Sequence, residues 1–300
     1  MSQKSDFLEE TFDMSQSSAI SQLDETVEEE EFEDDEENNF PRREFEFASL
    51  NELREDICEN TCVSLRELFK TYTFIGCVDP ERCLVQFGTS VYLLDLSAIL
   101  KLFFYQITIF NFGNFPIYKI EEPYPQISNL LEVLANLSRE DNNYAPFSIF
   151  ENPEKVEEAE NLLEFNSELF SNYFSIKFNR NDENRLVMSE IPSMVTHFCP
   201  QLEKLPFLIG ALVMDVDYEE EKSCFSGIAK ALADFFTIHK CFTEEKKLSA
   251  FSDVRWESQI RQIIMPQLRK KLLPSEILKD NIQQLADAHD LYKVFERCGS

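Results

Sequence analysis

The chain has 300 residues and carries 56 Asp and Glu against 28 Lys and Arg, a formal net charge of −28. This acidity argues against phosphate contacts as the main source of affinity for a partner, because nucleic-acid binders present basic surface. The six glycines are scattered, which excludes a phosphate-cradling loop and a dinucleotide-binding fingerprint. We find no signal peptide, and no stretch approaches the roughly 20 apolar residues of a membrane span.

The acidic residues are concentrated near the N-terminus. Residues 1–47 hold 17 Asp and Glu and only 3 Lys and Arg, and like charges at this density repel and oppose collapse. We therefore expect a disordered acidic linker over 1–47, either a solvated tether or a segment that docks a basic partner. The remaining residues are rich in Leu, Ile and Phe, and a domain of that size folds without a disulfide or a metal.

The first folded segment has helical spacing of its apolar residues over 49–69. Ser49 with Glu52 three residues later fits a capping box, which places the helix start there. The period then changes to that of short strands, interrupted by turn signals at Asp79-Pro80 and at Gly88. We predict an antiparallel meander of three strands, over 73–78, 83–87 and 91–94.

The next segments alternate between helix and strand. A long apolar run predicts a buried helix over 97–110, which Pro116 prevents from continuing. A fourth strand is expected at 117–120, a helix at 127–137 and a loop at 141–151. Asn152 followed by Pro153 is typical of a helix start, because Asn caps the helix and Pro lacks an N–H that is not needed there.

The later part repeats these signals. Two strands are expected over 174–178 and 186–191, around a turn at 179–184, followed by an apolar run at 205–216. A second amphipathic helix starts near Phe225 and places His239 on its apolar face. Residues 256–273 have a helical pattern that Pro266 should kink or break.

The eight cysteines form no C-x-x-C pair, so a self-contained four-ligand zinc site is not indicated. Free thiols are typical of a reducing compartment, the cytosol or nucleus. A Cys–His nucleophile pair stays open as an alternative, because such partners meet in space rather than in sequence.

Several side-chain groups have both a functional and a plain structural interpretation. The pairs His197/Cys199 and His239/Cys241 could each contribute to a metal site, but a loop position and a core histidine are the simpler interpretations. A basic group could contact phosphate or form a solvated helix end, where the dipole favours cations: Arg261, Arg269, Lys270 and Lys271. A run of three glutamates, 219–221, could hold a cation but fits a charged first helical turn better.

The C-terminal stretch 290–298 is unusually apolar for a chain end, since end residues are normally polar and frayed. We expect it to be docked, with four partner-binding side chains: Leu291, Tyr292, Val294 and Phe295. Docking would hold the Cys298 thiol in place as a metal ligand or a nucleophile, whereas the simpler interpretation is a small buried apolar residue.

These residues carry a resemblance to a known family. The segments are Phe74-Ile75-Gly76-Cys77-Val78-Asp79-Pro80, Tyr92-Leu93-Leu94-Asp95, Leu202-Glu203-Lys204-Leu205-Pro206 and, most specific, Asp290 to Cys298. Residues 50–298 resemble the C-terminal dimerisation domain of the eukaryotic MutL homologues of type one, in the mismatch-repair MutL family. The family's N-terminal ATPase has no counterpart, so the chain is expected to be a fragment or a truncated member.

The resemblance implies a mixed α/β (α+β) fold, with a dimerisation subdomain built from early and late segments and a smaller inserted middle subdomain. It implies a linker at 1–47, the domain at 48–298 and a middle subdomain at roughly 123–200. Family members of this type end on the cysteine, so residues 299–300 are a terminal extension, either native or of cloning origin.

It further implies a nuclear, non-catalytic subunit of DNA mismatch repair. The subunit would form a heterodimer with a second MutL homologue that carries a metal-dependent endonuclease, through apolar faces of the early strands, the helix at 97–110 and the tail. It would also dock the pathway exonuclease and other repair proteins, and it would contact DNA only indirectly. The family's endonuclease motif is absent, and no cofactor of its own is expected. Cys298 would reach the partner's zinc or manganese site. The alternatives are a cysteine- or metal-dependent enzyme active as an isolated chain, and a purely acidic adaptor.

Overall fold

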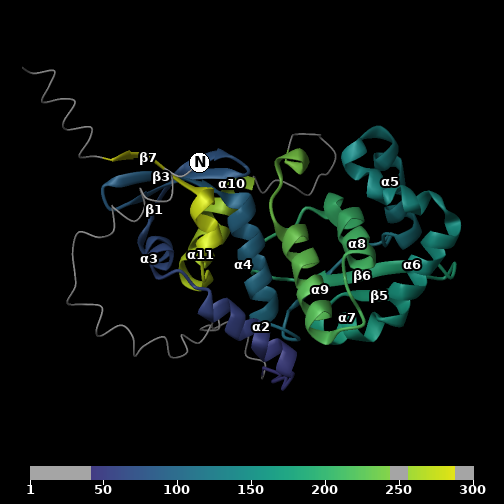
Figure 1. The fold of residues 1–300 in the computed structure, drawn as a ribbon. Helices are drawn as coiled ribbons and strands as arrows, with labels where there is room; N and C mark the ends of the chain where they lie inside the picture. The colour runs from purple at the N-terminus through teal and green to yellow at the C-terminus, as the bar shows by residue number, and fades with distance from the viewer. Residues whose placement is uncertain (1–41, 244–255, 288–300) are drawn as a thin grey trace, which may run out of the picture. The chain divides into compact units, whose positions relative to one another are not determined.

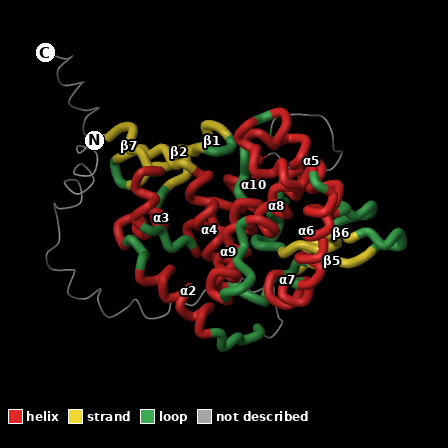
Figure 2. Tube along the Cα trace, turned by 45° about the vertical axis from the view of Figure 1, so that its right-hand side comes forward, coloured by secondary structure: helices red, strands yellow, loops and turns green. Residues whose placement is uncertain are grey.

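The computed structural model describes residues 42–243 and 256–287. These residues belong to a single unit that begins at Arg42 and has a mixed α/β fold, as predicted. It contains two small antiparallel sheets, with strand orders β1-β2-β3-β7 and β4-β6-β5 (Figures 1 and 2).

The first sheet confirms the predicted meander and joins it to the end of the described chain. Its strands are β1 (Thr73–Asp79), β2 (Arg82–Phe87), β3 (Ser90–Asp95) and β7 (Ile282–Asp287). Leu94 pairs with Ile282 and Val91 with Ala286, so the last strand adds to the early meander. Early and late segments therefore build one sheet, as the fold-class prediction states.

Helices cover one face of this sheet. The helix that lies directly on β2 and β3 is α4 (Leu96–Phe110). The other helices of this part of the fold are α2 (Ala48–Glu59), α3 (Val63–Thr71), α9 (Glu221–Phe236), α10 (Trp256–Gln259) and α11 (Met265–Lys271). Helix α4 packs against β2, β3 and α9, and its apolar residues are buried on nearly all sides. A helix this uniformly apolar belongs in a core, so the buried helix predicted over 97–110 is confirmed, and α4 does not present a free apolar face in this structure.

The second sheet consists of β4 (Ile117–Lys119), β5 (Lys177–Arg180) and β6 (Leu186–Pro192). The helices that pack around it are α5 (Ile127–Glu140), α6 (Pro153–Phe165), α7 (Ser167–Phe174) and α8 (Leu205–Met214). Asn152 caps α6 as predicted, since its Oδ1 accepts from the Glu154 N–H at 3.0 Å. The boundaries of the inserted subdomain stay a prediction.

Four local expectations were wrong. The first is the single helix over 49–69, which is two helices separated by residues 60–62. Its predicted start is also wrong, because α2 begins after Phe47 and the Ser49 hydroxyl donates to Glu221 rather than capping the helix. The loop at 141–151 is the 3-10 helix η2 (Asn142–Glu151), begun by a cap from Asp141. Residue 174 ends α7 rather than starting a strand.

The fourth concerns His239, which lies beyond the end of α9 and caps the 3-10 turn η4 (Lys240–Phe242). Two further 3-10 turns are η3 (Leu202–Lys204) and η6 (Glu276–Asn281).

Pro266 does not break its helix. A π-helical segment, η5 (Ile260–Ile264), lies between α10 and α11, directly before the proline. A wider π turn removes the clash between the proline ring and the carbonyl four residues earlier, and it tolerates the missing N–H. The chain therefore continues as helix, with a local change of helix type, through a position where the sequence predicts a kink or a break.

Residues 42–47, which composition assigns to the linker, are packed on the folded unit and are called here the N-terminal strap. The side chain of Asn114 binds the strap backbone twice, accepting from Arg43 N at 2.8 Å and donating to Arg43 O at 2.9 Å. Phe45 packs edge-on against Phe112, and Gly113 approaches the Phe45 ring closely. Residues 42–47 therefore belong to the folded unit, and the rest of the predicted linker, residues 1–41, lies outside the described part.

Candidate interaction face and neighbouring sites

The first sheet has one covered face and one open face. Cross-strand rows alternate between them, because directly opposite residues share a face. The row Cys77–Cys83–Leu94–Ile282 faces the helices, and Cys83 and Leu94 are fully buried.

The neighbouring row, Gly76–Leu84–Leu93–Gln283, faces the opposite side and is only partly buried. A Cβ built on Gly76 meets nothing within 4 Å, which is consistent with an open surface there.

Helices hold the covered face in place. The Arg261 guanidinium of η5 lies 5.4 Å from the centre of the Phe74 ring on β1. The Tyr72 hydroxyl donates to Met265 O at 2.6 Å, which ties the start of β1 to α11. In Figures 1 and 2, α4 and α11 lie on this side of the sheet, and no described element covers the other side.

The open face and its edges carry exposed apolar side chains. Ile75 and Val78 on edge strand β1 are 45% and 52% exposed, and Leu285 on edge strand β7 is 50% exposed. Part-buried Leu84, Leu93 and Val91 lie between the two edges. We call this surface the outer face: Ile75, Val78, Leu84, Val91, Leu93 and Leu285. Exposed apolar side chains gathered on one uncovered sheet face make it a candidate interaction site.

Sequence reasoning named the early strands but missed the individual residues of the outer face. The signal was present in the continuous apolar runs Cys83-Leu84-Val85 and Val91 to Leu94. A strand with one solvent-exposed face alternates apolar and polar residues. A strand that is apolar throughout is typical of a sheet whose two faces are both covered, here in the assembled complex.

The predicted tail residues cannot be compared with the outer face. Leu291, Tyr292, Val294, Phe295 and Cys298 lie outside the described residues, as do Gly299 and Ser300. Strand β7 ends at Asp287, whose carboxylate accepts from the Ser90 hydroxyl at 2.7 Å. The tail therefore starts three residues beyond an edge of this sheet.

Within residues 42–243 and 256–287, no three His, Cys, Asp or Glu side chains are grouped closely enough to hold a metal ion. His239 instead faces Glu81, with Nδ1 3.6 Å from Oε1, and it accepts from the Cys241 N–H at 3.4 Å. His197 has a left-handed φ of +64° in an exposed loop beside Cys199. Glu221 lies in the first turn of α9, as the charged-turn interpretation predicts.

Three thiols, those of Cys77, Cys83 and Cys224, have a pKa shifted away from activation. Burial raises the pKa of Cys77 and of Cys224 to about 11, and it raises that of Cys83 further. A nucleophilic cysteine needs the opposite shift, because the thiolate is the reactive form.

Structural contacts occupy part of the basic group. Arg261 lies on Phe74, as described above, and Arg269 lies 5.0 Å from the centre of the Tyr72 ring while donating to Tyr72 O. Arg66 donates to the carbonyls of Arg269 and Lys270, each at 2.9 Å, at the C-terminal end of α11. These contacts favour the helix-end interpretation over phosphate binding.

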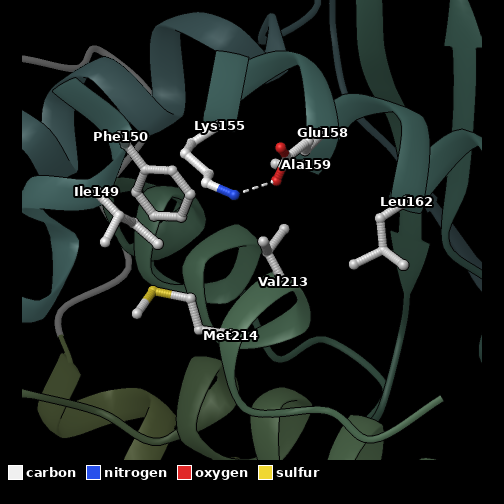
Figure 3. A pocket seen from close by; sticks show the side chains of 8 residues that line it. All are labelled: Ile149, Phe150, Lys155, Glu158, Ala159, Leu162, Val213 and Met214. Atoms are coloured by element: carbon white, nitrogen blue, oxygen red, sulfur yellow. Dashed lines mark hydrogen bonds and ion pairs between the residues drawn. The ribbon is translucent and has the colours of Figure 1, made fainter. Parts of the chain in front are cut away.

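A second feature is a groove of about 550 Å³ between η2, α6 and α8. The Lys155 Nζ–Glu158 Oε2 ion pair, 2.6 Å long, spans one side of it (Figure 3). The rest of the lining is apolar and comprises Ile149, Phe150, Ala159, Leu162, Val213 and Met214. Sequence reasoning did not place this groove, because its walls come from segments more than 50 residues apart.

No helix of the described part is long and apolar enough to cross a membrane.

Comparison with known proteins identifies the family. Residues 46–298 match the family model described as the C-terminus of the DNA mismatch repair protein Mlh1.

Two relatives are similar at 29% identity. DNA mismatch repair protein Mlh1 of Dictyostelium discoideum aligns over 85% of this chain and 30% of its own length, and MLH1 of Saccharomyces cerevisiae over 84% and 34%. The chain thus spans about a third of the length of these curated relatives. Because the match covers nearly all of the chain beyond the linker, the chain belongs to the Mlh1 C-terminal domain family.

Proposed function

We propose that this chain is a non-catalytic subunit of DNA mismatch repair that forms a heterodimer with a second, endonuclease-bearing MutL homologue. Family membership and the names of its relatives support the repair role. The observation that carries the dimerisation role is the outer face, an apolar surface of the first sheet that no described element covers.

The proposed interface combines the outer face with the tail. Obligate interfaces commonly bury about 2,000 Å² or more and are rich in apolar residues. The outer face supplies such residues on both edge strands, at Ile75, Val78 and Leu285. The tail follows β7 closely in the chain, and we propose that Leu291, Tyr292, Val294 and Phe295 extend the same surface toward the partner.

We further propose that Cys298 contributes a thiolate to the zinc or manganese site of the partner. A thiolate is a soft ligand that suits zinc better than manganese. The repair role places the protein in the nucleus and leaves DNA contact to the assembled complex.

Variants at the edge strands test the interface. Val78 and Leu285 are about half exposed, so Val78→Asp and Leu285→Asp should leave folding nearly unchanged. In the complex each would lose roughly 1 kcal/mol of apolar burial and bury an unpaired carboxylate, which together weaken binding more than tenfold. Light scattering of the chain mixed with the partner domain measures the loss.

Phe165→Asp is the matched control, because Phe165 on α6 is 88% exposed and far from the first sheet in sequence. It should bind the partner normally. If the two edge-strand variants bind as well as this control does, the outer face is not the interface. Leu291→Pro tests the tail separately and should abolish co-purification, because a docked segment loses a backbone donor there.

The alternative of an enzyme active as an isolated chain has its own test. The purified chain alone should leave supercoiled DNA intact in the presence of manganese, and nicking should require the partner. Nicking by the chain alone, lost in Cys298→Ala, would establish the alternative.

The groove supports a second role, docking of the pathway exonuclease through a short apolar motif. Its lining from Ile149 to Met214 suits an apolar side chain, and Lys155 with Glu158 can orient a polar backbone. Val213→Glu should remove binding of a labelled exonuclease segment, while Val133→Glu on exposed α5 should not. Equal binding by both variants would exclude the groove.

A further inference from the structure

Two cysteines face each other across the first two strands. In the β1–β2 register, Cys77 lies directly opposite Cys83. Directly opposite residues of an antiparallel pair share a face and have Cα atoms about 4.5–5.5 Å apart. Disulfides span Cα separations of about 4.4–6.8 Å. The Cα separation expected for Cys77 and Cys83 therefore falls within the range of a disulfide, while both thiols are free.

The two thiols differ in access. Cys83 is fully buried on the covered face, whereas Cys77 is only part-buried on an edge strand and packs at the margin of the core. The charges that act on Cys77 come from Glu257, Arg261 and Asp79. The thiols are close enough for a negative charge on Cys77 to raise the pKa of Cys83.

Strand β1 is irregular around Cys77, whereas the turn that joins it to β2 is held by an ion pair. Register shifts flank Cys77, between Phe74 and Gly76 and between Cys77 and Asp79, so β1 is bulged on both sides of the cysteine. The turn between the strands is held by a 2.6 Å ion pair between Arg82 Nη2 and Asp79 Oδ2. A bulged strand bends and twists more than a regular one, which favours the torsional change that a bond between two opposed sulfurs requires.

We propose that Cys77 and Cys83 form a redox modification site, a cross-strand dithiol that a low-molecular-weight disulfide such as oxidised glutathione converts to an intrachain disulfide. The site goes beyond the proposed repair function and stands whether or not the outer face is an interface.

The reaction proceeds in two exchanges. The accessible Cys77 gives its proton to solvent, and its thiolate attacks one sulfur of oxidised glutathione, which breaks that disulfide and releases one glutathione thiolate. The Cys83 thiol then attacks the Cys77 sulfur of the mixed disulfide, and its proton passes to the glutathione sulfur that leaves as the second glutathione thiol. The two thiols lose two electrons and two protons, and the oxidant is reduced to two glutathione molecules.

Trypsin separates the two cysteines, which makes the product measurable. Cleavage after Lys70, Arg82 and Lys101 places Cys77 in peptide 71–82 and Cys83 in peptide 83–101. The folded chain is incubated with oxidised glutathione, alkylated, digested and examined by mass spectrometry. We expect these two peptides to appear as one disulfide-linked pair in the wild type.

The rate should rise about tenfold per pH unit between pH 7 and 9, because a thiol with a pKa of about 11 gains thiolate at that rate. Cys77→Ser should remove the linked pair without opening the core, and Cys58→Ser, at an exposed cysteine on α2, should leave it unchanged. Separate glutathione adducts on both peptides, or linkage that appears only after denaturation, would overturn the proposal.

Discussion

Gly113 offers the sharpest test of how the N-terminal strap is held. Its φ of +69° is left-handed, and a Cβ built there lies 2.5 Å from Cζ of Phe45. Alanine in this conformation costs roughly 1–2 kcal/mol. Phe45 must also move away from Phe112 and Tyr173, whose ring centres lie 5.6 and 5.5 Å away, and each such ring pair contributes about 0.5–1.5 kcal/mol.

Gly113→Ala should therefore lower the free energy of unfolding by about 2–4 kcal/mol, measured by urea denaturation of the full chain. Gly88→Ala is the matched control, because Gly88 has a φ of +58° but nothing within 4 Å of a built Cβ. It should cost only the conformational strain, about 1–2 kcal/mol.

A double-mutant cycle isolates the contact. In a Phe45→Ala background, Gly113→Ala should cost no more than Gly88→Ala does, because the ring that it displaces is gone. If Gly113→Ala costs the same in both backgrounds, the strap is not packed on Gly113 and the reasoning is refuted.

Three further changes have expected outcomes in denaturation experiments. Asn152→Ala removes the α6 cap and should cost about 0.5–2 kcal/mol, and Asn152→Gly should cost less. Tyr72→Phe deletes a fully buried hydroxyl that donates to Met265 O, and a loss of about 0.5–1.5 kcal/mol is expected; no change would mean that the bond contributes nothing net. Burial lowers the pKa of Lys204, which donates to the carbonyls at the end of α9, to about 8. Between that value and the ordinary lysine pKa, the unfolded chain therefore binds more protons than the folded chain does. The free energy of unfolding of the wild type, relative to that of Lys204→Met, should rise by up to roughly 3 kcal/mol as pH increases from 8 to 10.5. A difference that does not change with pH would contradict the lowered pKa.

The parts of the fold that sequence predicted are those that local chemistry determines. The strands of the meander follow from β-rich runs between turn residues, and β1, β2 and β3 occupy those runs. Asn152-Pro153 starts α6 because the cap and the fixed proline φ act within three residues.

The parts that sequence missed depend on contacts between distant segments. Ser49 has the residue type and spacing of a cap, but its hydroxyl donates to Glu221, which is 172 positions away. The composition of helix α4 fits an interface helix and a core helix equally well. Only its packing against α9 and the first sheet shows that it is a core helix. Pro266 predicts a kink or a break, yet the π-helical segment before it accommodates the proline within a continuous helical stretch.

The candidate site shows the same division. The sequence identified the early strands and the tail as interface material, but the outer face required the register that pairs Leu84 with Leu93. Cys77 and Cys83 are six positions apart, which is no recognised ligand spacing. Their opposition depends on the bulges of β1, which composition does not reveal.

Hydrogen–deuterium exchange of the chain, alone and with the endonuclease-bearing MutL partner domain, tests the proposed interface most directly. On complex formation, exchange should slow in peptides covering β1 and β7, at residues 73–79 and 282–287, and stay unchanged in the second sheet at 177–192. Protection confined to the second sheet, with both edge strands of the first sheet exchanging as in the free chain, would contradict the proposal.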